Sequence, residues 1–321
     1  MVGYNPEPIS GKELSATDYS EAGLASGIAT RAIIQPLDVL KIRFQLQEEP
    51  IGGMRSGKYR SVIQSIQLIT KEEGIRAFWK GHIPAQGLSA MYGLVQFSAY
   101  EWLSKAITIH VNCGRASSDF IAGGLSGSLA MTAAMPLDVI RTRLVAQAQV
   151  AGGDPDGTRP IVYRGTLHAM VKIARKEGPA GFFRGWLPSV AQVAPFTGLQ
   201  FWFYNVICSQ LDMWSGSRES SHALVSGATA GALAKTMLYP LDMVRHRLQM
   251  NGFQRVTTFG QTSDYSRGMT RSVMLIVKRE GLLGLFKGLW PSQIKAAANS
   301  GCAFLFYELF CDIIRSRKEL E

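Results

Sequence analysis

One short motif occurs three times along this chain, and its copies stand about one hundred residues apart. Each copy has a proline, an acidic residue two positions later, and basic residues five and seven positions after the proline; the prolines are Pro36, Pro136 and Pro240. Internal repeats predict copies of one structural unit rather than unrelated domains. We therefore divide the 321 residues into a tail and three repeats: 1–17, 18–110, 116–212 and 218–316.

A second motif follows each copy of the first. It has Glu-Gly, four further residues, an aromatic residue, a basic residue and a glycine, and it closes at Gly81, Gly185 and Gly288. Upstream of each motif proline stands a Gly-x-x-x-Gly pair, a spacing that lets membrane helices approach closely. The pairs are Gly23 and Gly27, Gly123 and Gly127, and Gly227 and Gly231. A proline inside a helix removes a hydrogen bond and bends the helix, so each repeat is expected to contain a kinked helix.

Long apolar stretches separate the charged segments. Three of them hold no Asp, Glu, Lys or Arg: 83–100, 120–137 and 185–211. Each has at least 18 residues, enough for a helix to cross about 30 Å of hydrocarbon. Three others contain an internal base: 21–37 with Arg31, 223–241 with Lys235 and 289–307 with Lys295. A charge at the bilayer centre costs about 2.5–3.5 kcal/mol, so three of them in repeat-related helices predict a polar interior.

The basic residues are concentrated in three long segments. Of the 34 Lys and Arg residues, 24 lie in 41–81, 141–185 and 245–288, whereas the loops 105–117 and 212–222 hold only three. Loops rich in Lys and Arg tend to stay on the inner side of a membrane. Apolar periodicity predicts short surface helices in the basic segments, near 60–71, 164–175 and 268–279. We expect an all-α membrane protein with six transmembrane helices in three pseudo-threefold repeats, each with one short inner-side helix.

Two other classes of protein fit this sequence poorly. The net charge is +10, but the bases recur with the period of the apolar helices, which argues against a nucleic-acid surface. The chain has no Gly-x-x-x-x-Gly-Lys phosphate loop, no His-Glu-x-x-His motif and no Cys-x-x-Cys pair. We therefore expect a protein that is not an enzyme and holds neither a metal nor a cofactor.

Together the two tripled motifs resemble those of the mitochondrial carrier family, over roughly residues 20–315. The resemblance implies a multi-pass protein of the mitochondrial inner membrane that moves small molecules by alternating access at one central site. It implies that both termini face the intermembrane space and that anionic lipid such as cardiolipin binds at helix ends. A monomer is expected, because three repeats can complete the ring within one chain.

The first motif predicts a ring of charges. Each acid lies three positions before a base, so a pair within one helix is the simple alternative. The family resemblance implies instead a matrix gate that closes by pairs between repeats: Asp38 with Arg245, Asp138 with Lys41, and Asp242 with Arg141. Gln45 and Gln249 stand four residues after their base, where the family has a bracing glutamine, and Val145 takes the third position.

The opposite ends of the even-numbered helices depart from the family pattern. Two of its three acidic positions are kept as Glu101 and Glu308, and the third is Asn205. The basic positions hold uncharged residues: Ser104, Cys208 and Cys311. The usual ion pairs cannot form there, which leaves hydrogen bonds from Tyr100, Tyr204 and Tyr307 to close this end. We predict a weak outer gate and a resting state with the matrix gate shut.

The three bases within the spans are candidates for a substrate site. Arg31 and Lys235 each lie five residues before their motif proline, and Lys295 lies seven after its motif glycine. Snorkelling to an interface is the alternative, but their depth favours a site for a diphosphate. The planar fork of Arg31 can bind two phosphate oxygens, and the lysines add point charges. Leu88 and Gln192 are the repeat equivalents of Lys295, at positions that the family resemblance makes substrate contacts.

Aromatic and amide side chains on the even-numbered helices suit the rest of such a ligand. Tyr92 and Phe196 can stack on a ring or a cation, and Gln96, Gln200 and Asn299 can hydrogen-bond its edge; each is as readily a packing residue. Strings such as 41–47, 77–82 and 198–201 resemble family members that carry thiamine pyrophosphate. The expected function is import of that compound in exchange for nucleotides or thiamine monophosphate. The alternative is a carrier of the same family for adenine nucleotides or coenzyme A.

Overall fold

The computed structural model describes residues 15–47, 58–110, 115–147, 163–215, 220–253 and 268–320, and all regular structure in these ranges is helical. The long helices are α1 (Ala16–Leu46), α3 (His82–His110), α4 (Arg115–Ala146), α7 (Val193–Ser215), α8 (Ser220–Gln249) and α10 (Leu289–Leu320). Five of them have 29 to 32 residues. At 1.5 Å per residue they are about 45 Å long, which exceeds the thickness of a bilayer's hydrocarbon core.

Three short helices follow the odd-numbered spans, as predicted, with ends displaced by one or two residues. They are α2 (Val62–Glu73), α5 (Thr166–Glu177) and α9 (Met269–Glu280), and each leads into a 3-10 turn: η1 (Ile75–Trp79), η2 (Pro179–Phe183) and η4 (Leu282–Phe286). Each short helix ends at the glycine of the second motif, where φ is 77° at Gly74, 68° at Gly178 and 77° at Gly281. Glycine adopts such angles without a steric penalty, which explains its place after each glutamate.

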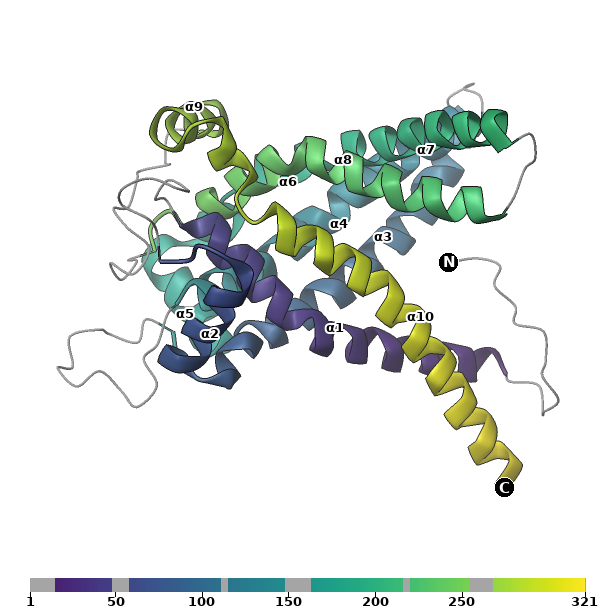
Figure 1. Cartoon of the computed structure of the whole chain (residues 1–321), viewed down its shortest axis with the longest axis horizontal. Helices are drawn as coiled ribbons and strands as arrows, with labels where there is room; N and C mark the ends of the chain where they lie inside the picture. The colour runs from purple at the N-terminus through teal and green to yellow at the C-terminus, as the bar shows by residue number, and fades with distance from the viewer. Residues whose placement is uncertain are drawn as a thin grey trace.

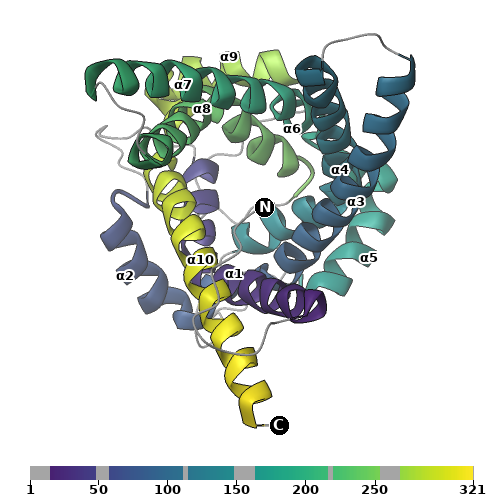
Figure 2. The ribbon, with the colours of Figure 1, turned by 90° about the vertical axis from the view of Figure 1, so that its right-hand side faces the viewer.

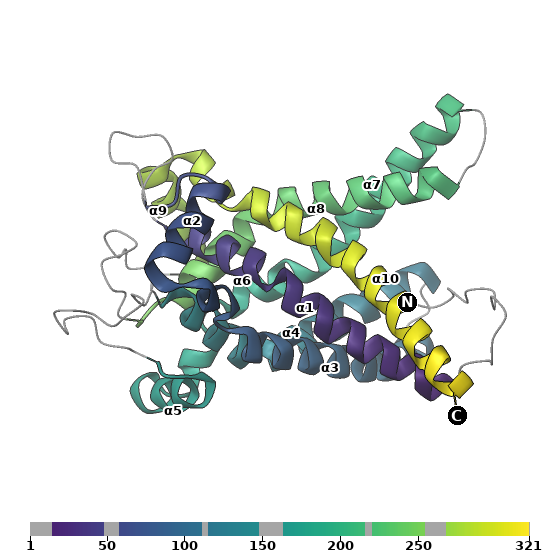
Figure 3. The ribbon, with the colours of Figure 1, turned by 60° about the horizontal axis from the view of Figure 1, so that its bottom comes forward.

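The short helices gather at one end of the molecule, and the long helices run from there to the other end (Figure 1). Seen along its length, the long helices surround a common axis (Figure 2). They pack most extensively as three pairs: α3 with α4, α1 with α10, and α7 with α8. The pairs diverge away from the short helices, so that α7 and α8 stand apart from α1 and α10 (Figure 3). We call this the outer end; α1 begins and α10 ends there.

The even-numbered helix of the second repeat differs from the prediction. Its charge-free stretch suggests one continuous helix, but the structure has a short α6 (Trp186–Ala191), a turn at Gln192, and then α7. Pro195 explains the break, because it has no N–H to donate to the carbonyl of Ala191. The motif prolines of α1, α4 and α8, by contrast, lie inside continuous helices.

The Gly-x-x-x-Gly pairs mark a close helix contact in one repeat only. A Cβ on Gly127 would lie 2.8 Å from Cγ1 of Val193, so α4 and α7 approach closely there. A Cβ on Gly23, Gly27 or Gly227 would meet nothing within 4 Å. The same is true of Gly123. The expectation of close approach is therefore wrong for these four positions in this structure, because the helix pairs diverge toward the outer end.

Many large apolar side chains of the helices are exposed. Leu24 is 70% exposed, and Phe97 and Trp290 are 77% exposed. Extensive exposed apolar surface marks contact with lipid or a partner rather than with water. Among the described residues, two helical stretches are long and apolar enough on their own to cross a membrane: Ser117–Ala146 and Leu282–Lys318.

Candidate functional site

The three copies of the first motif meet near the short helices, where their charged side chains form ion pairs between repeats. The pairs are Asp38 with Arg141 (2.5 Å), Asp138 with Arg245 (2.6 Å) and Asp242 with Lys41 (2.7 Å). The six expected charges do come together, but the expected order of partners is wrong. Each acid pairs with the base of the next repeat, where the prediction took the preceding one. Motif spacing places the charges at one level, whereas the tilt of the helices decides which neighbours meet.

Glutamines reinforce two of these pairs. Nε2 of Gln45 donates to Oδ2 of Asp242 (2.9 Å) and to the hydroxyl of Tyr239 (2.9 Å). Nε2 of Gln249 donates to Oδ2 of Asp138. At the third position, Val145 is fully buried in an apolar cluster. The pair formed by Asp38 therefore has no glutamine beside it.

A second set of buried charges, which the sequence analysis did not single out, lies next to the short helices. Three arginines are at most 1% exposed, and both guanidinium Nη atoms of each contact the carboxylate at the end of a short helix. The pairs are Arg43 with Glu73, Arg143 with Glu177, and Arg247 with Glu280. Each arginine also donates from Nε to a main-chain carbonyl of the next repeat: those of Val145, Gln249 and Gln45. Both motifs carry these residues in every copy, which was the available signal.

Glu73 of this layer remains charged although its side chain is buried. Burial raises the pKa of the Glu73 carboxyl, but the hydrogen bonds and the charge of Arg43, together with Lys80, outweigh burial and hold the pKa below its usual value. Nζ of Lys80 lies 2.6 Å from the Glu73 carboxylate. Burial in turn lowers the pKa of Lys80, and the neighbouring carboxylate opposes that change. The pair between Glu73 and Arg43 therefore ties α2 to α1 through charge rather than through neutral hydrogen bonds.

The three bases predicted for the substrate site lie beside the ring of ion pairs. Nζ of Lys295 contacts Oδ1 of Asp38. Nζ of Lys235 donates to the carbonyl of Ser292 (2.5 Å) and interacts electrostatically with Lys295. Arg31 interacts electrostatically with Asp38. All three are partly buried, and all three interact with Asp38.

The other predicted contacts lie along α3, α6, α7 and α10. Tyr92 packs against the buried cluster formed by Met131, Met135 and Val139, and it interacts electrostatically with Arg245. Gln192 stands at the break between α6 and α7, where its carbonyl accepts a hydrogen bond from N–H of Phe196 (3.0 Å). Four more are half-buried or exposed: Leu88, Gln96, Gln200 and Asn299. Within the described ranges, no side-chain hydrogen bond joins these residues to the three bases.

The residues expected at the outer gate lie on the diverging ends of the helices. Glu101 pairs with Lys105 on its own helix (2.9 Å), and both side chains are 72% exposed. The hydroxyl of Tyr100 donates to Asp119 (3.3 Å). In the part of the chain that the structure describes, no hydrogen bond or ion pair joins any two of the five expected residues: Tyr100, Glu101, Tyr204, Tyr307 and Glu308. The outer end is therefore not closed through them while the ring of ion pairs is closed.

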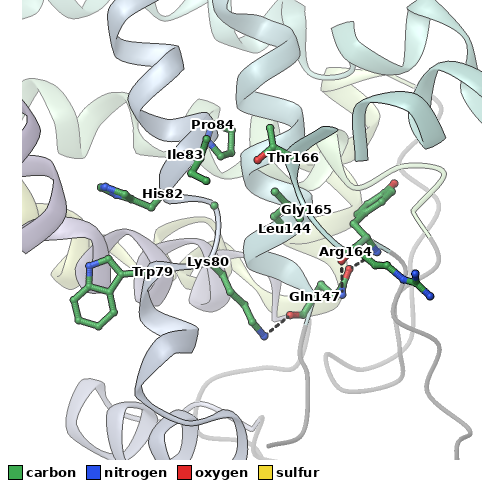
Figure 4. A pocket seen from close by; sticks show the side chains of 12 residues that line it. Trp79, Lys80, His82, Ile83, Pro84, Leu144, Gln147, Arg164, Gly165 and Thr166 are labelled. Carbon is green, nitrogen blue, oxygen red and sulfur yellow. Dashed lines mark hydrogen bonds between the residues drawn. The ribbon is translucent and has the colours of Figure 1, made fainter. Parts of the chain in front are cut away.

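A pocket lies between the first and second repeats, at the N-terminal ends of α3 and α5 (Figure 4). Trp79, Lys80, Tyr163 and Arg164 are among the residues that line it. Nζ of Lys80 donates to the carbonyl of Gln147 (3.2 Å), which ties the two repeats together at the pocket. Helix N-termini present free N–H groups to an anion. Basic side chains beside two such termini make this pocket suited to a phosphate group.

Comparison with known proteins places this architecture in a family. Three segments of the chain, 12–111, 114–212 and 217–318, match the family described as mitochondrial carrier protein. The chain belongs to the mitochondrial carrier family, whose members are multi-pass transporters of the mitochondrial inner membrane. The family resemblance and the fold predicted from the sequence are thus confirmed, and so is the prediction that the chain is not an enzyme.

Relatives across nearly the whole length narrow the comparison further. The chain is 39% identical to the mitochondrial thiamine pyrophosphate carriers of Macaca fascicularis and Homo sapiens, over 98% of this chain and 97% of each relative. It is 38% identical to the protein of that name from Bos taurus, over the full length of both. It is also 36% identical to the mitochondrial thiamine pyrophosphate carrier 1 of Neosartorya fischeri, over 89% of this chain and 90% of the relative.

Proposed function

We propose that this carrier imports thiamine pyrophosphate into the mitochondrial matrix in exchange for nucleotides or thiamine monophosphate. The observation that carries the proposal is that Arg31, Lys235 and Lys295 all interact with Asp38, a member of the closed ring of ion pairs. A diphosphate brings the negative charge that three clustered cations need, and the names of the relatives point to one particular diphosphate.

In this proposal the diphosphate binds first to the three bases. Arg31 holds two of its oxygens in a planar fork, and the two lysines act as point charges. Gln192 and Leu88, the repeat equivalents of Lys295, border the same level. The organic part of the substrate then extends toward the outer end. Tyr92 and Phe196 stack on its rings, and Gln96, Gln200 and Asn299 accept or donate hydrogen bonds at its edge.

Alternating access follows from breaking one gate while the other forms. The six charges of the motif ring, with Gln45 and Gln249, act as the matrix gate, and Tyr100, Glu101, Tyr204, Tyr307 and Glu308 act as the outer gate. A substrate that binds an intermediate closed state more tightly than either open state offsets the cost of breaking the ion pairs. An empty site supplies no binding energy to offset the broken ion pairs, so strict exchange is the expected mode of transport. One chain contains all three repeats, so a monomer is sufficient.

The pocket at the start of α3 and α5 is proposed to bind anionic lipid such as cardiolipin. Lys80 and Arg164 supply positive charge there, and Trp79 and Tyr163 supply apolar contact for an acyl chain. We further propose that the end with the short helices, which holds most of the Lys and Arg residues, lies at the matrix face and that the termini lie toward the intermembrane space.

The test is uptake of labelled thiamine pyrophosphate into liposomes that contain the purified protein and are preloaded with nucleotide, thiamine monophosphate or buffer. Saturable uptake that depends on an internal counter-substrate is expected. Lys295→Ala should abolish uptake without loss of folded protein, whereas Lys71→Ala, at an exposed position on α2, should retain it. Absence of uptake alongside rapid exchange of adenine nucleotide or coenzyme A would assign the carrier to the alternative substrate.

A further inference from the structure

The three ion pairs that close the ring, Asp38–Arg141, Asp138–Arg245 and Asp242–Lys41, are not equivalent. Oδ2 of Asp138 accepts hydrogen bonds from Nε (3.1 Å) and Nη2 (2.6 Å) of Arg245 and another from Gln249. Asp242 lies 2.7 Å from its lysine and accepts a hydrogen bond from Gln45. These two carboxylates are therefore held by a base and a glutamine each.

The pair between Asp38 and Arg141 is bound in a different way. Nη2 of Arg141 lies 2.5 Å from Oδ2 of Asp38. Within the described residues, neither this Oδ2 nor Nε of Arg141 has a hydrogen-bond partner of acceptable geometry. The charges are in contact but are not aligned for a directed hydrogen bond. Since Val145 offers no amide, the motif itself supplies no second donor for Asp38.

Lys295 takes the place of the missing glutamine. Its Nζ contacts Oδ1 of Asp38, the oxygen that Arg141 leaves open. Asp38 is 1% exposed at its side chain, whereas that of Lys295 is 24% exposed, so the ammonium bridges a buried carboxylate and a more open space. Neither repeat equivalent, Leu88 or Gln192, carries a charge, so this bridge exists once in the ring. Lys235, in contrast, is bound to a main-chain carbonyl.

We propose that Lys295 is the latch of the matrix gate: without substrate it braces Asp38, and a diphosphate in the site draws it away so that the gate opens first between α1 and α4. The diphosphate part of this proposal rests on the proposed function. An ammonium that turns toward a phosphate leaves a buried carboxylate with one poorly aligned partner. Binding of the diphosphate and opening of the gate thus depend on the same side chain, Lys295. The two ion pairs that are braced by glutamine open later. Lys295 is a positioning residue for the gate as well as a substrate contact.

The latch is tested first without any ligand, by a double-mutant cycle of melting temperatures on the detergent-purified chain. Lys295→Gln should lower the melting temperature by several degrees in the wild-type background and by much less than that in Asp38→Asn. The matched cycle of Lys235→Gln with Asp38→Asn should be nearly additive. Equal losses from Lys295→Gln in both backgrounds would overturn the latch. This result does not depend on which substrate is carried.

The second test restores the brace. A glutamine four residues after the base reaches the carboxylate in the two other pairs, so Val145→Gln should brace Asp38 independently of Lys295. Val145→Met has a similar volume without the amide and controls for crowding in the apolar cluster. A hydrogen bond to a charged group that must break when the gate opens slows the opening step about tenfold or more. Val145→Gln should therefore reduce the maximal exchange rate of thiamine pyrophosphate by about that factor relative to Val145→Met, whereas the concentration for half-saturation should be similar in the two variants.

The outcomes separate the two proposals. If the wild type does not exchange thiamine pyrophosphate but the Lys295–Asp38 cycle is coupled, the substrate assignment fails and the ligand-free brace stands. The exchange assay is then repeated with nucleotide, to test whether that anion draws Lys295 away from Asp38. If exchange is robust but Val145→Gln is as fast as Val145→Met, the latch is wrong and the substrate assignment stands. Should Asp38→Asn not yield folded protein, the loss caused by Lys295→Gln is compared in wild type and in Val145→Gln, where it should shrink.

Discussion

Replacing Arg247 with methionine tests whether the buried arginine layer holds the repeats together. The change keeps an apolar side chain of similar length but removes both hydrogen bonds to Glu280 and the donations to the carbonyls of Gln45 and Gln47 (3.1 Å each). Removing one partner of a buried ion pair costs about 3–5 kcal/mol. Lys287 still contacts Glu280, which limits the loss, whereas the two carbonyls at the end of α1 add to it. We expect a net loss of about 4 kcal/mol.

The measurement is the melting temperature of the purified protein in detergent, followed by tryptophan fluorescence. At about 2 °C per kcal/mol, the lower end of the range for chains of 150–250 residues, the expected decrease is about 8 °C. Lys58→Met is the control, because Lys58 and Glu72 form a pair whose side chains are 21% and 39% exposed. An exposed pair is worth less than about 1 kcal/mol, so this variant should melt within about 2 °C of wild type. Equal shifts for the two variants would refute the reasoning.

Three further outcomes follow from the site. The pKa of Glu73 is lowered in the folded protein, so its pair with Arg43 stabilises the fold fully above about pH 4.5, and this stabilisation is lost as the pH falls through the folded pKa. The difference in melting temperature between wild type and Glu73→Gln should therefore be constant from pH 7 to about 4.5 and should shrink at lower pH. Gln249→Leu removes a donor to Asp138 and should lower the melting temperature by a few degrees, whereas a gap below one degree would argue against bracing. Tyr92→Ala should raise the half-saturation for thiamine pyrophosphate about threefold or more while leaving competition by inorganic pyrophosphate unchanged; equal effects on both would remove Tyr92 from the ring contacts.

Repetition explains why so much of the fold was predictable. Each motif position is supported three times, so the long helices and the short matrix-side helices could be inferred from apolar patterns. The meeting of the charges followed from the tripled motif together with the family resemblance. Which neighbouring repeat supplies the base that pairs with Asp38 could not be predicted. The spacing of residues along the chain does not distinguish the two neighbours, and the tilt of the helices, which does, is a property of the packed bundle. The outcome was a correct ring with every partner assigned to the wrong neighbour.

Several of the missed features occur in one repeat only. Pro195 has no counterpart in the other repeats, and it breaks the helix at Gln192. Val145 was recognised as the absent brace, but nothing in the sequence near Val145 says that Lys295, some 150 residues away, contacts the same carboxylate. Such a contact depends on how α10 crosses α1, which local patterns do not encode. The arginine layer was missed for the opposite reason: its residues sit inside motifs that were read only for their gate charges.

The three ion pairs of the ring all run the same way round, from the acid of the first repeat to the base of the second, from the second to the third, and from the third back to the first. Only two of these junctions are continuous in the chain; the last is made by contacts alone, and at the outer end it includes an ion pair of 2.5 Å between Lys318 and Asp18. Neighbouring chain ends are the condition under which circular permutation is tolerated. A circularly permuted chain could begin at α4, end at α3 and join α10 to α1 through a short linker. Such a chain would keep every ion pair of the ring, so the position at which synthesis starts is separable from the architecture of the ring.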